Sequence, residues 1–221
     1  MPRQIFEHEL QRIQDDMLVL ASMVDAAIAE SVAALAASDL RRARQVVEHD
    51  REINRRRFLI EEECIRVMAT QQPLATDLRV IVAVLNIITD LERMGDHAEG
   101  IGRITLLLVG EHQLADLGLI QQMTTKARSM LRDSVTAFID RDVKAAQAIC
   151  LRDDKVDTLY DTVYATALNR MIQQPGLITS QTYLLWIAHN LERIADRTTN
   201  IAERVVFLIT GHMDELNVSR Y

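Results

Sequence analysis

Side chains that could bind a cation recur at a fixed spacing in this chain of 221 residues. Residues four apart on an α-helix lie one above the other, with about 5–6 Å between their Cβ atoms. Two such pairs on adjacent antiparallel helices would gather their side chains into one acidic patch. Four pairs at this spacing are expected to face neighbouring helices: Asp50 with Asn54, Glu92 with Asp96, Asp153 with Asp157, and Glu192 with Asp196.

Ionised carboxylates held side by side and partly buried repel one another, so their charge must be balanced. A metal ion, a set of arginines, or proton uptake by one member of a pair could each balance it. A set of oxygen ligands favours Mg²⁺, Ca²⁺, Mn²⁺ or oxidised iron over a thiolate-preferring metal. We therefore expect a divalent or iron-type ion (Fe, Mn, Zn or Mg) at these eight side chains, or arginines in its place.

Helical geometry suggests that the acidic pairs continue apolar stripes. At 100° per residue, Glu92 and Asp96 lie within about 40° of Leu78, Val82 and Leu85 on one helix face. The later pairs are placed in the same way, so each acidic side chain is expected to point toward neighbouring helices. The residues expected to share these other faces are Ala43, Val46, Cys64 and Met68 with Asp50 and Asn54; Ala146, Ile149, Tyr164 and Met171 with Asp153 and Asp157; and Leu185, His189, Asn200 and Glu203 with Glu192 and Asp196.

The two halves of this pattern differ in nearby charge. Arg57 falls on the acidic face of the first half, and Arg103 follows Glu99 by one turn. Tyr160 and Glu203 occupy the matching positions of the second half, which leaves more negative charge there. The second half is therefore predicted to be the stronger metal site, with His189 as a candidate additional ligand.

Long helices must position these residues, because the chain has only 7 glycines and 3 prolines. An all-β fold is excluded, since it would need a turn every 8–12 residues, and an α/β fold with glycine-rich turns is disfavoured. Apolar periodicity, caps and breakers predict an all-α protein. Its six helices are expected at about 4–37, 39–70, 75–110, 114–139, 142–172 and 179–211.

A buried stripe and local signals support these boundaries. Asp39 and Asp142 are good N-caps, Gly110 and Gly211 are good C-terminal caps, and Pro73 interrupts the pattern. The first helix has apolar or small residues spaced three or four apart, as a helical bundle requires: Ile13, Met17, Leu20, Val24, Ile28, Ser31 and Leu35.

The six helices form two copies of a three-helix unit. Shifting residues 85–101 by 100 positions aligns them with 185–201, and seven of these 17 positions are identical. A shift of 103 aligns residues 39–54 with 142–157 and superimposes the two N-caps. We therefore expect two tandem repeats, 1–111 and 112–221, joined near residues 112–116.

Composition narrows the class of protein further. A formal net charge of −7 argues against nucleic-acid binding, which needs clustered basic residues. Charge-free runs such as residues 80–89 are too short to span a membrane, and the N-terminus does not have the pattern of a signal peptide. The two cysteines, Cys64 and Cys150, have no metal or redox spacing and are expected to be buried free thiols in a reducing cytoplasm.

At its acidic motifs the sequence resembles the PhoU family of phosphate-uptake regulators. The resemblance rests on Asp-x-x-x-Asn/Asp in the second helix of each repeat and Glu-Arg-Met/Ile-Gly/Ala-Asp in the third. It implies two three-helix bundles side by side, usually dimeric, with acidic motifs that in some members bind multinuclear iron or other metal clusters. By resemblance, the ligands would be Asp50, Glu92 and Asp96 in the first repeat, and Asp153, Asp157, Glu192 and Asp196 in the second, whereas Asn54 departs from the acidic form.

The resemblance also implies a function other than catalysis. Members of the family are adaptors that link a high-affinity phosphate ABC transporter, through its ATPase, to a membrane sensor histidine kinase. They hold the phosphate-starvation response off when phosphate is plentiful. Such an adaptor would be cytoplasmic, without membrane insertion of its own.

Two alternatives stay open from the sequence. A carboxylate-bridged metalloenzyme is disfavoured, because such bundles use Glu-x-x-His and no glutamate here has histidine three residues later. A metal-free helical scaffold would retain the adaptor role.

Overall fold

The computed structural model describes residues 2–108 and 117–212, which form six long α-helices and one short 3₁₀ helix with no strand among them. The all-α fold predicted from the sequence is confirmed. The 112–116 connection, the 111/112 repeat boundary and the Gly110 cap fall outside the described residues. The helices are α1 (Pro2–Ala37), α2 (Leu40–Gln71), α3 (Thr76–Leu107), α4 (Gly118–Asp140), α5 (Val143–Gln173), η1 (Pro175–Leu177) and α6 (Ile178–Thr210).

The predicted caps begin and end these helices. The Asp39 carboxylate accepts hydrogen bonds from the backbone N–H groups of Arg41 and Arg42, and Asp142 caps α5 in the same way. These bonds satisfy amide groups that have no partner within the helix. Gly211 ends α6 in the left-handed conformation at φ 78°, where a residue without a Cβ is favoured.

The two repeats are alike in detail. Ser31 in α1 and Ser134 in α4 are both fully buried, and each hydroxyl donates to the carbonyl three residues earlier in its helix. The two serines are 103 residues apart, which is the separation of the Asp39 and Asp142 caps. The predicted stripe of α1 is confirmed, since every residue in it from Ile13 to Leu35 is buried.

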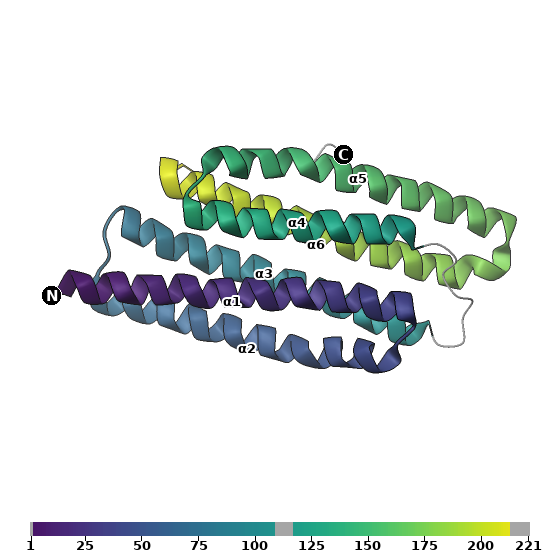
Figure 1. Ribbon diagram of the computed structural model, residues 1–221, viewed down its shortest axis with the longest axis horizontal. Coiled ribbons are helices and arrows are strands. Elements are labelled where there is room, and N and C mark those ends of the chain that lie inside the picture. The colour runs from purple at the N-terminus through teal and green to yellow at the C-terminus, as the bar shows by residue number, and fades with distance from the viewer. Residues whose placement is uncertain (1, 109–116, 213–221) are drawn as a thin grey trace.

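Each repeat is a three-helix bundle, and the bundles lie side by side along their length (Figure 1). Contacts between the repeats come from α3 with α6 and from α1 with α4, whereas α2 and α5 lie at opposite outer edges. In Figure 1, α1 and α3 run away from the end marked N, and α4 and α6 run in the opposite direction. The repeats are therefore antiparallel across their shared interface.

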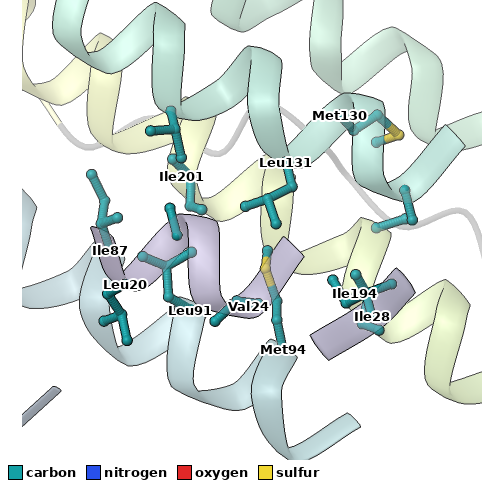
Figure 2. Close-up of a cluster of buried hydrophobic side chains, with 14 of the residues drawn as sticks. Leu20, Val24, Ile28, Ile87, Leu91, Met94, Met130, Leu131, Ile194 and Ile201 are labelled. Carbon is teal, nitrogen blue, oxygen red and sulfur yellow. The ribbon is translucent and has the colours of Figure 1, made fainter. Parts of the chain in front are cut away.

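One hydrophobic core runs through the junction between the repeats. Figure 2 shows side chains from α1, α3, α4 and α6 meeting there, so the two bundles share a core and do not merely touch. The labelled side chains are all buried: Leu20, Val24, Ile28, Ile87, Leu91, Met94, Met130, Leu131, Ile194 and Ile201.

Helix α1 is the one described helix that is long and apolar enough to cross a membrane by length and composition. Its apolar stripe packs in this core, which accounts for its hydrophobicity in a helical bundle. Cys64 and Cys150 are buried free thiols, as predicted.

Candidate functional site

The acidic site of the first repeat is centred on Asp50, where α2 approaches α3 closely. Gly95 eases this approach, because a Cβ there would lie 3.1 Å from Ile53 Cγ2, closer than most Cβ contacts, and 3.5 Å from Asp50 Oδ1. Asn54 Nδ2 donates to Asp50 Oδ2 at 2.7 Å. The other oxygen, Asp50 Oδ1, is buried and has no hydrogen-bond partner among the described residues.

The electrostatics of Asp50 show that the predicted residues lie close together. The pKa of Asp50 is raised to about 6, mainly by burial and further by the negative charges of Asp96, Glu99 and Glu92 on α3, while Arg103 opposes the rise. A carboxyl group with such a pKa exchanges a proton near neutral pH, and a nearby cation would stabilise its ionised form. The structure therefore brings Asp50, Glu92 and Asp96 close enough for their charges to interact, with Asn54 hydrogen-bonded to Asp50.

Arginines reduce the negative charge of this first site. Arg93 lies between the two acidic residues of its motif, with Nη1 3.1 Å from Asp96 Oδ2 and Nε 3.5 Å from Glu92 Oε2. Burial and Asp96 raise the pKa of Glu92, while the positive charges of Arg93, Arg57 and Arg197 lower it. The predicted compensation by Arg57 is thus present.

Arg103 also balances charge as predicted. Its Nη2 lies 2.5 Å from Glu99 Oε1, and its positive charge lowers the pKa of Asp50.

The second repeat has a more tightly paired acidic site. Glu192 is only 9% exposed, and Arg193 donates to both of its oxygens, from Nε to Oε2 at 2.7 Å and from Nη2 to Oε1 at 2.8 Å. Arg193 Nη1 also lies 2.8 Å from Asp196 Oδ2. One guanidinium therefore serves both acidic residues of the motif.

Helix α5 contributes Asp157 to this second site. The Asp153 residue is 1% exposed, whereas Asp157, one turn later on α5, is exposed to solvent. Partial desolvation raises the pKa of Asp157, and the charges of Asp196, Asp154 and Asp161 add to the rise. Burial also raises the pKa of Glu192. Arg193 lowers it through its charge and its hydrogen bonds, and the charges of Asp196 and Asp157 add to the rise. The charges of Asp157 on α5 and of Glu192 and Asp196 on α6 therefore interact with one another.

His189 lies at the edge of the second site. Its Nδ1 is 3.6 Å from Glu192 Oε2, its ring is tilted against that of Tyr160, and its side chain is half exposed. Burial lowers the pKa of His189, and Arg193 lowers it further, which favours the neutral imidazole. His189 as a metal ligand stays a prediction.

The structure corrects three expectations about these sites. The stripe of Leu78, Val82 and Leu85 is not buried core, since Leu78 is 40% exposed and the other two are half-buried. Glu92 and Asp96 therefore lie at the boundary between core and solvent. The real core face of α3, which includes Ile87, Leu91 and Met94, is rotated away from the acidic residues.

The second correction concerns charge balance. The second repeat was expected to carry more uncompensated charge, because Tyr160 and Glu203 replace Arg57 and Arg103 there. That difference remains, but Arg193 pairs with both Glu192 and Asp196, as Arg93 pairs with Glu92 and Asp96, so neither acidic pair lacks a cation. The Glu-Arg-x-x-Asp spacing, present in both repeats, was the sequence signal for this role of Arg93 and Arg193. Among the described residues, no three His, Cys, Asp or Glu side chains are placed to hold one metal ion together.

The third correction concerns Asn200, which was assigned to the acidic face of the second repeat. Its Nδ2 instead donates to Asp90 Oδ1 of the first repeat at 3.0 Å, and Arg197 Nη1 reaches the same oxygen at 3.2 Å. Asp90 is 8% exposed, and burial raises its pKa while these two donors lower it. This contact between the repeats was not predicted from the sequence.

Comparison with known proteins identifies the duplicated motif. The PhoU domain model matches the chain twice, over residues 17–105 and 120–205, one match for each three-helix bundle. The chain belongs to the PhoU family. Both acidic motifs described above lie inside the PhoU matches.

PhoU relatives match the chain over nearly its full length. It is 38% identical over 218 residues to a phosphate-specific transport system accessory protein PhoU homolog of Clostridium acetobutylicum, covering 98% of this chain and 100% of the relative. A homolog of the same description from Streptococcus pneumoniae is 36% identical over 216 residues, which cover 97% of this chain and all of the relative.

Solved PhoU structures have the same fold. The crystal structure of the phosphate transport system regulatory protein PhoU from Streptococcus pneumoniae matches with a TM-score of 0.89 and 34% identity, over 95% of this chain and 99% of that one. PhoU from Pseudomonas aeruginosa matches with a TM-score of 0.89 and 31% identity, over 94% and 100% of the two chains. The two-bundle architecture predicted from the sequence is confirmed.

Proposed function

We propose that this protein is a negative regulator of the phosphate-starvation response and a modulator of phosphate uptake. It acts as a cytoplasmic adaptor between the ATPase of a phosphate ABC transporter and a sensor histidine kinase. The observation that carries this proposal is the PhoU match in both repeats, together with full-length relatives described as phosphate-specific transport system accessory proteins. Those descriptions, and that of the solved Streptococcus pneumoniae structure as a regulatory protein, support a regulatory role over an enzymatic one.

The outer helices provide surfaces that suit an adaptor. On α2, Phe58 and Leu59 are more than half exposed, and on α5 Leu151 and Ile172 are exposed to a greater extent. Exposed apolar side chains on a stable bundle are suited to contact with other proteins. We expect these faces to serve the transporter ATPase, the histidine kinase or a second copy of the chain in a homodimer.

Deletion of the gene tests the regulatory role. In high phosphate, a phosphate-starvation reporter should become active in the deletion strain and return to its low level when the wild-type chain is supplied. A reporter that stays silent in the deletion strain would reject the negative-regulator proposal. Purification of the tagged chain with the transporter ATPase and the kinase would test each adaptor contact separately.

We also propose that the acidic sites bind a divalent or iron-type cation. Asp50, Glu92 and Asp96 would hold it in the first repeat, and Asp153, Asp157, Glu192 and Asp196 in the second, with the Asn54 amide oxygen as a weaker ligand. Asp50 Oδ1, which is buried without a hydrogen-bond partner among the described residues, supports this proposal. The acidic side chains would have to change conformation to surround an ion, because no three of those described are placed to hold one together. The cation would neutralise the charge that now raises the pKa of Asp50.

A metal-free scaffold is the second candidate, and the arginine contacts favour it. Arg193 already pairs with both Glu192 and Asp196, so that site is compensated without a cation. Elemental analysis of protein purified without a chelating tag distinguishes the two candidates. Absence of bound metal, with no uptake of Mn²⁺, Zn²⁺ or iron on addition, would reject the metal site and leave the adaptor proposal unaffected.

A further inference from the structure

The interface between the repeats has an internal two-fold symmetry. Between α3 and α6, Asp90 contacts Arg197, and Asn190 Oδ1 lies 2.9 Å from His97 Nδ1. The shift of 100 residues that relates α3 to α6 converts the first of these contacts into the second. Each repeat therefore presents the same surface to the other, as two subunits do in a symmetric dimer.

The contact between α1 and α4 lies on the axis of this symmetry. The shift of 103 residues, which superimposes Ser31 on Ser134, also superimposes Asp25 on Arg128. These two equivalent residues bind each other: Arg128 Nε donates to Asp25 Oδ1 at 2.8 Å, and Nη2 donates to Oδ2 at 2.7 Å. In a two-fold interface, a residue that contacts its own equivalent lies at the axis.

Alike surfaces can pair in more than one way. A first repeat could pair with a second repeat, or two first repeats from different chains could pair with each other, as in domain exchange. The apolar residues of the interface do not discriminate, since equivalent positions such as Leu91 and Leu191 are both buried leucines. Asp25 and Arg128 do discriminate, because their charges are opposite.

Pairing of like repeats would place like charges on the axis. Two first repeats would bring Asp25 against a second Asp25, and two second repeats would bring Arg128 against Arg128, with Arg132 close by. The Asp25 and Arg128 side chains are only 18% and 28% exposed, so solvent screens such repulsion weakly. Arg132 Nη1, 3.7 Å from Asp25 Oδ2, adds to the selectivity.

We propose that the Asp25–Arg128 ion pair selects the pairing of a first repeat with a second repeat and rejects the pairing of like repeats. The ion pair thus determines specificity at the interface that holds the two acidic sites in one body. Specificity of this kind arises from a repulsive contact in the wrong partner as much as from an attractive contact in the right one.

Charge reversal in the full chain tests the local part of the proposal. D25R and R128D should each lower the thermal midpoint by at least about 3 °C. D25R should lower it more, because Arg132 still faces Asp25 in R128D. The double variant D25R/R128D should recover more than half of the larger loss. Equal losses that simply add in the double variant would overturn the proposal.

The two native thiols report whether the repeats stay coupled. Cys64 is buried in the first repeat and Cys150 in the second, so a thiol reagent under mild denaturant measures the opening of each bundle. Both should be labelled at similar rates in the wild type and at clearly different rates in D25R. The control E30R/R42E reverses an ion pair between α1 and α2 within one repeat, and should leave the two rates coupled.

A refolding experiment tests the selection itself. D25R and R128D are unfolded, mixed and refolded together, so that exchanged pairing between the two chains again brings opposite charges to the axis. Thiol protection in the mixture should exceed that of either variant refolded alone. Wild-type protein mixed in the same way should show no gain. A mixture no better protected than the separate variants would overturn the proposal.

Discussion

The Asp90 carboxylate of α3 depends on Arg197 of α6, whose Nη1 lies 3.2 Å from Asp90 Oδ1 across the interface between the repeats. Asp90 is almost fully buried, and its equivalent in the second repeat is the neutral Asn190. A charged group at this depth requires a partner, and the partner belongs to the other repeat.

Replacement of Arg197 by methionine should therefore destabilise the protein by about 2 kcal/mol at pH 8, because Asp90 then keeps the Asn200 amide as a donor but loses the cation that pairs with it. The loss should be smaller at pH 5, since burial raises the pKa of Asp90 and favours its neutral form. The matched variant D90N/R197M should be more stable than R197M alone. Chemical denaturation at both pH values measures this, and an equal loss at the two would contradict it.

The helices and their duplication could be predicted from the sequence because their signals are local. Asp39 and Asp142 cap helices through bonds to amides two and three residues away, and the stripe of α1 follows from spacing alone. The contact of Asn200 with Asp90 could not be predicted in this way. Helical angles place residues on one helix, but they do not specify which face meets the other repeat.

The roles of Arg93 and Arg193 depend on side-chain conformation. Each arginine is next to a glutamate and three residues before an aspartate, so it can fold back onto both or extend into solvent. The structure shows the folded-back conformation in both repeats. The acidic residues of the candidate site were identified from the sequence, but their compensation in the second repeat was not.

The pKa of Asp50 predicts a dependence of stability on pH. Folding raises this pKa from 3.8 to about 6, so between these values the folded protein binds more protons than the unfolded chain. The contribution of Asp50 to stability is therefore lost as pH rises through that window. In the presence of a chelator, Asp50→Asn should raise the free energy of unfolding at pH 8 by about 1 kcal/mol after allowance for solvent screening, and have little effect at pH 4.

Thermal unfolding of wild type and D50N at the two pH values checks this prediction. The local contact survives the substitution, because the side-chain carbonyl introduced in D50N can still accept a hydrogen bond from Asn54 Nδ2. A stabilisation of the same size at pH 4 and pH 8 would contradict the electrostatic explanation.

The backbone conformation of Ala75, at the turn between α2 and α3, predicts that glycine at this position would stabilise the protein. Its φ of 46° and ψ of −114° form a conformation that is costly for a residue with a Cβ. Ala75→Gly should raise the free energy of unfolding by about 1 kcal/mol, even though glycine adds freedom to the unfolded chain. The control A69G, in an exposed helical position of α2, should lower it by about 1 kcal/mol. Urea denaturation compares the two variants, and destabilisation by both would show that the backbone of Ala75 is not strained.

Arg193 and a cation should substitute for each other at the second acidic site. Arg193→Gln removes the charge that pairs with Glu192 and Asp196, so without metal it should destabilise the protein by about 1–2 kcal/mol at pH 7. Addition of Mn²⁺ should restore more stability to R193Q than to the wild type, because the acidic oxygens are then open to the ion. The control R42Q removes an arginine that pairs with Glu30 in the first repeat, and should show no such recovery. Thermal unfolding with and without Mn²⁺ measures the difference, and equal recovery in R193Q and R42Q would show that Arg193 does not stand in for a metal.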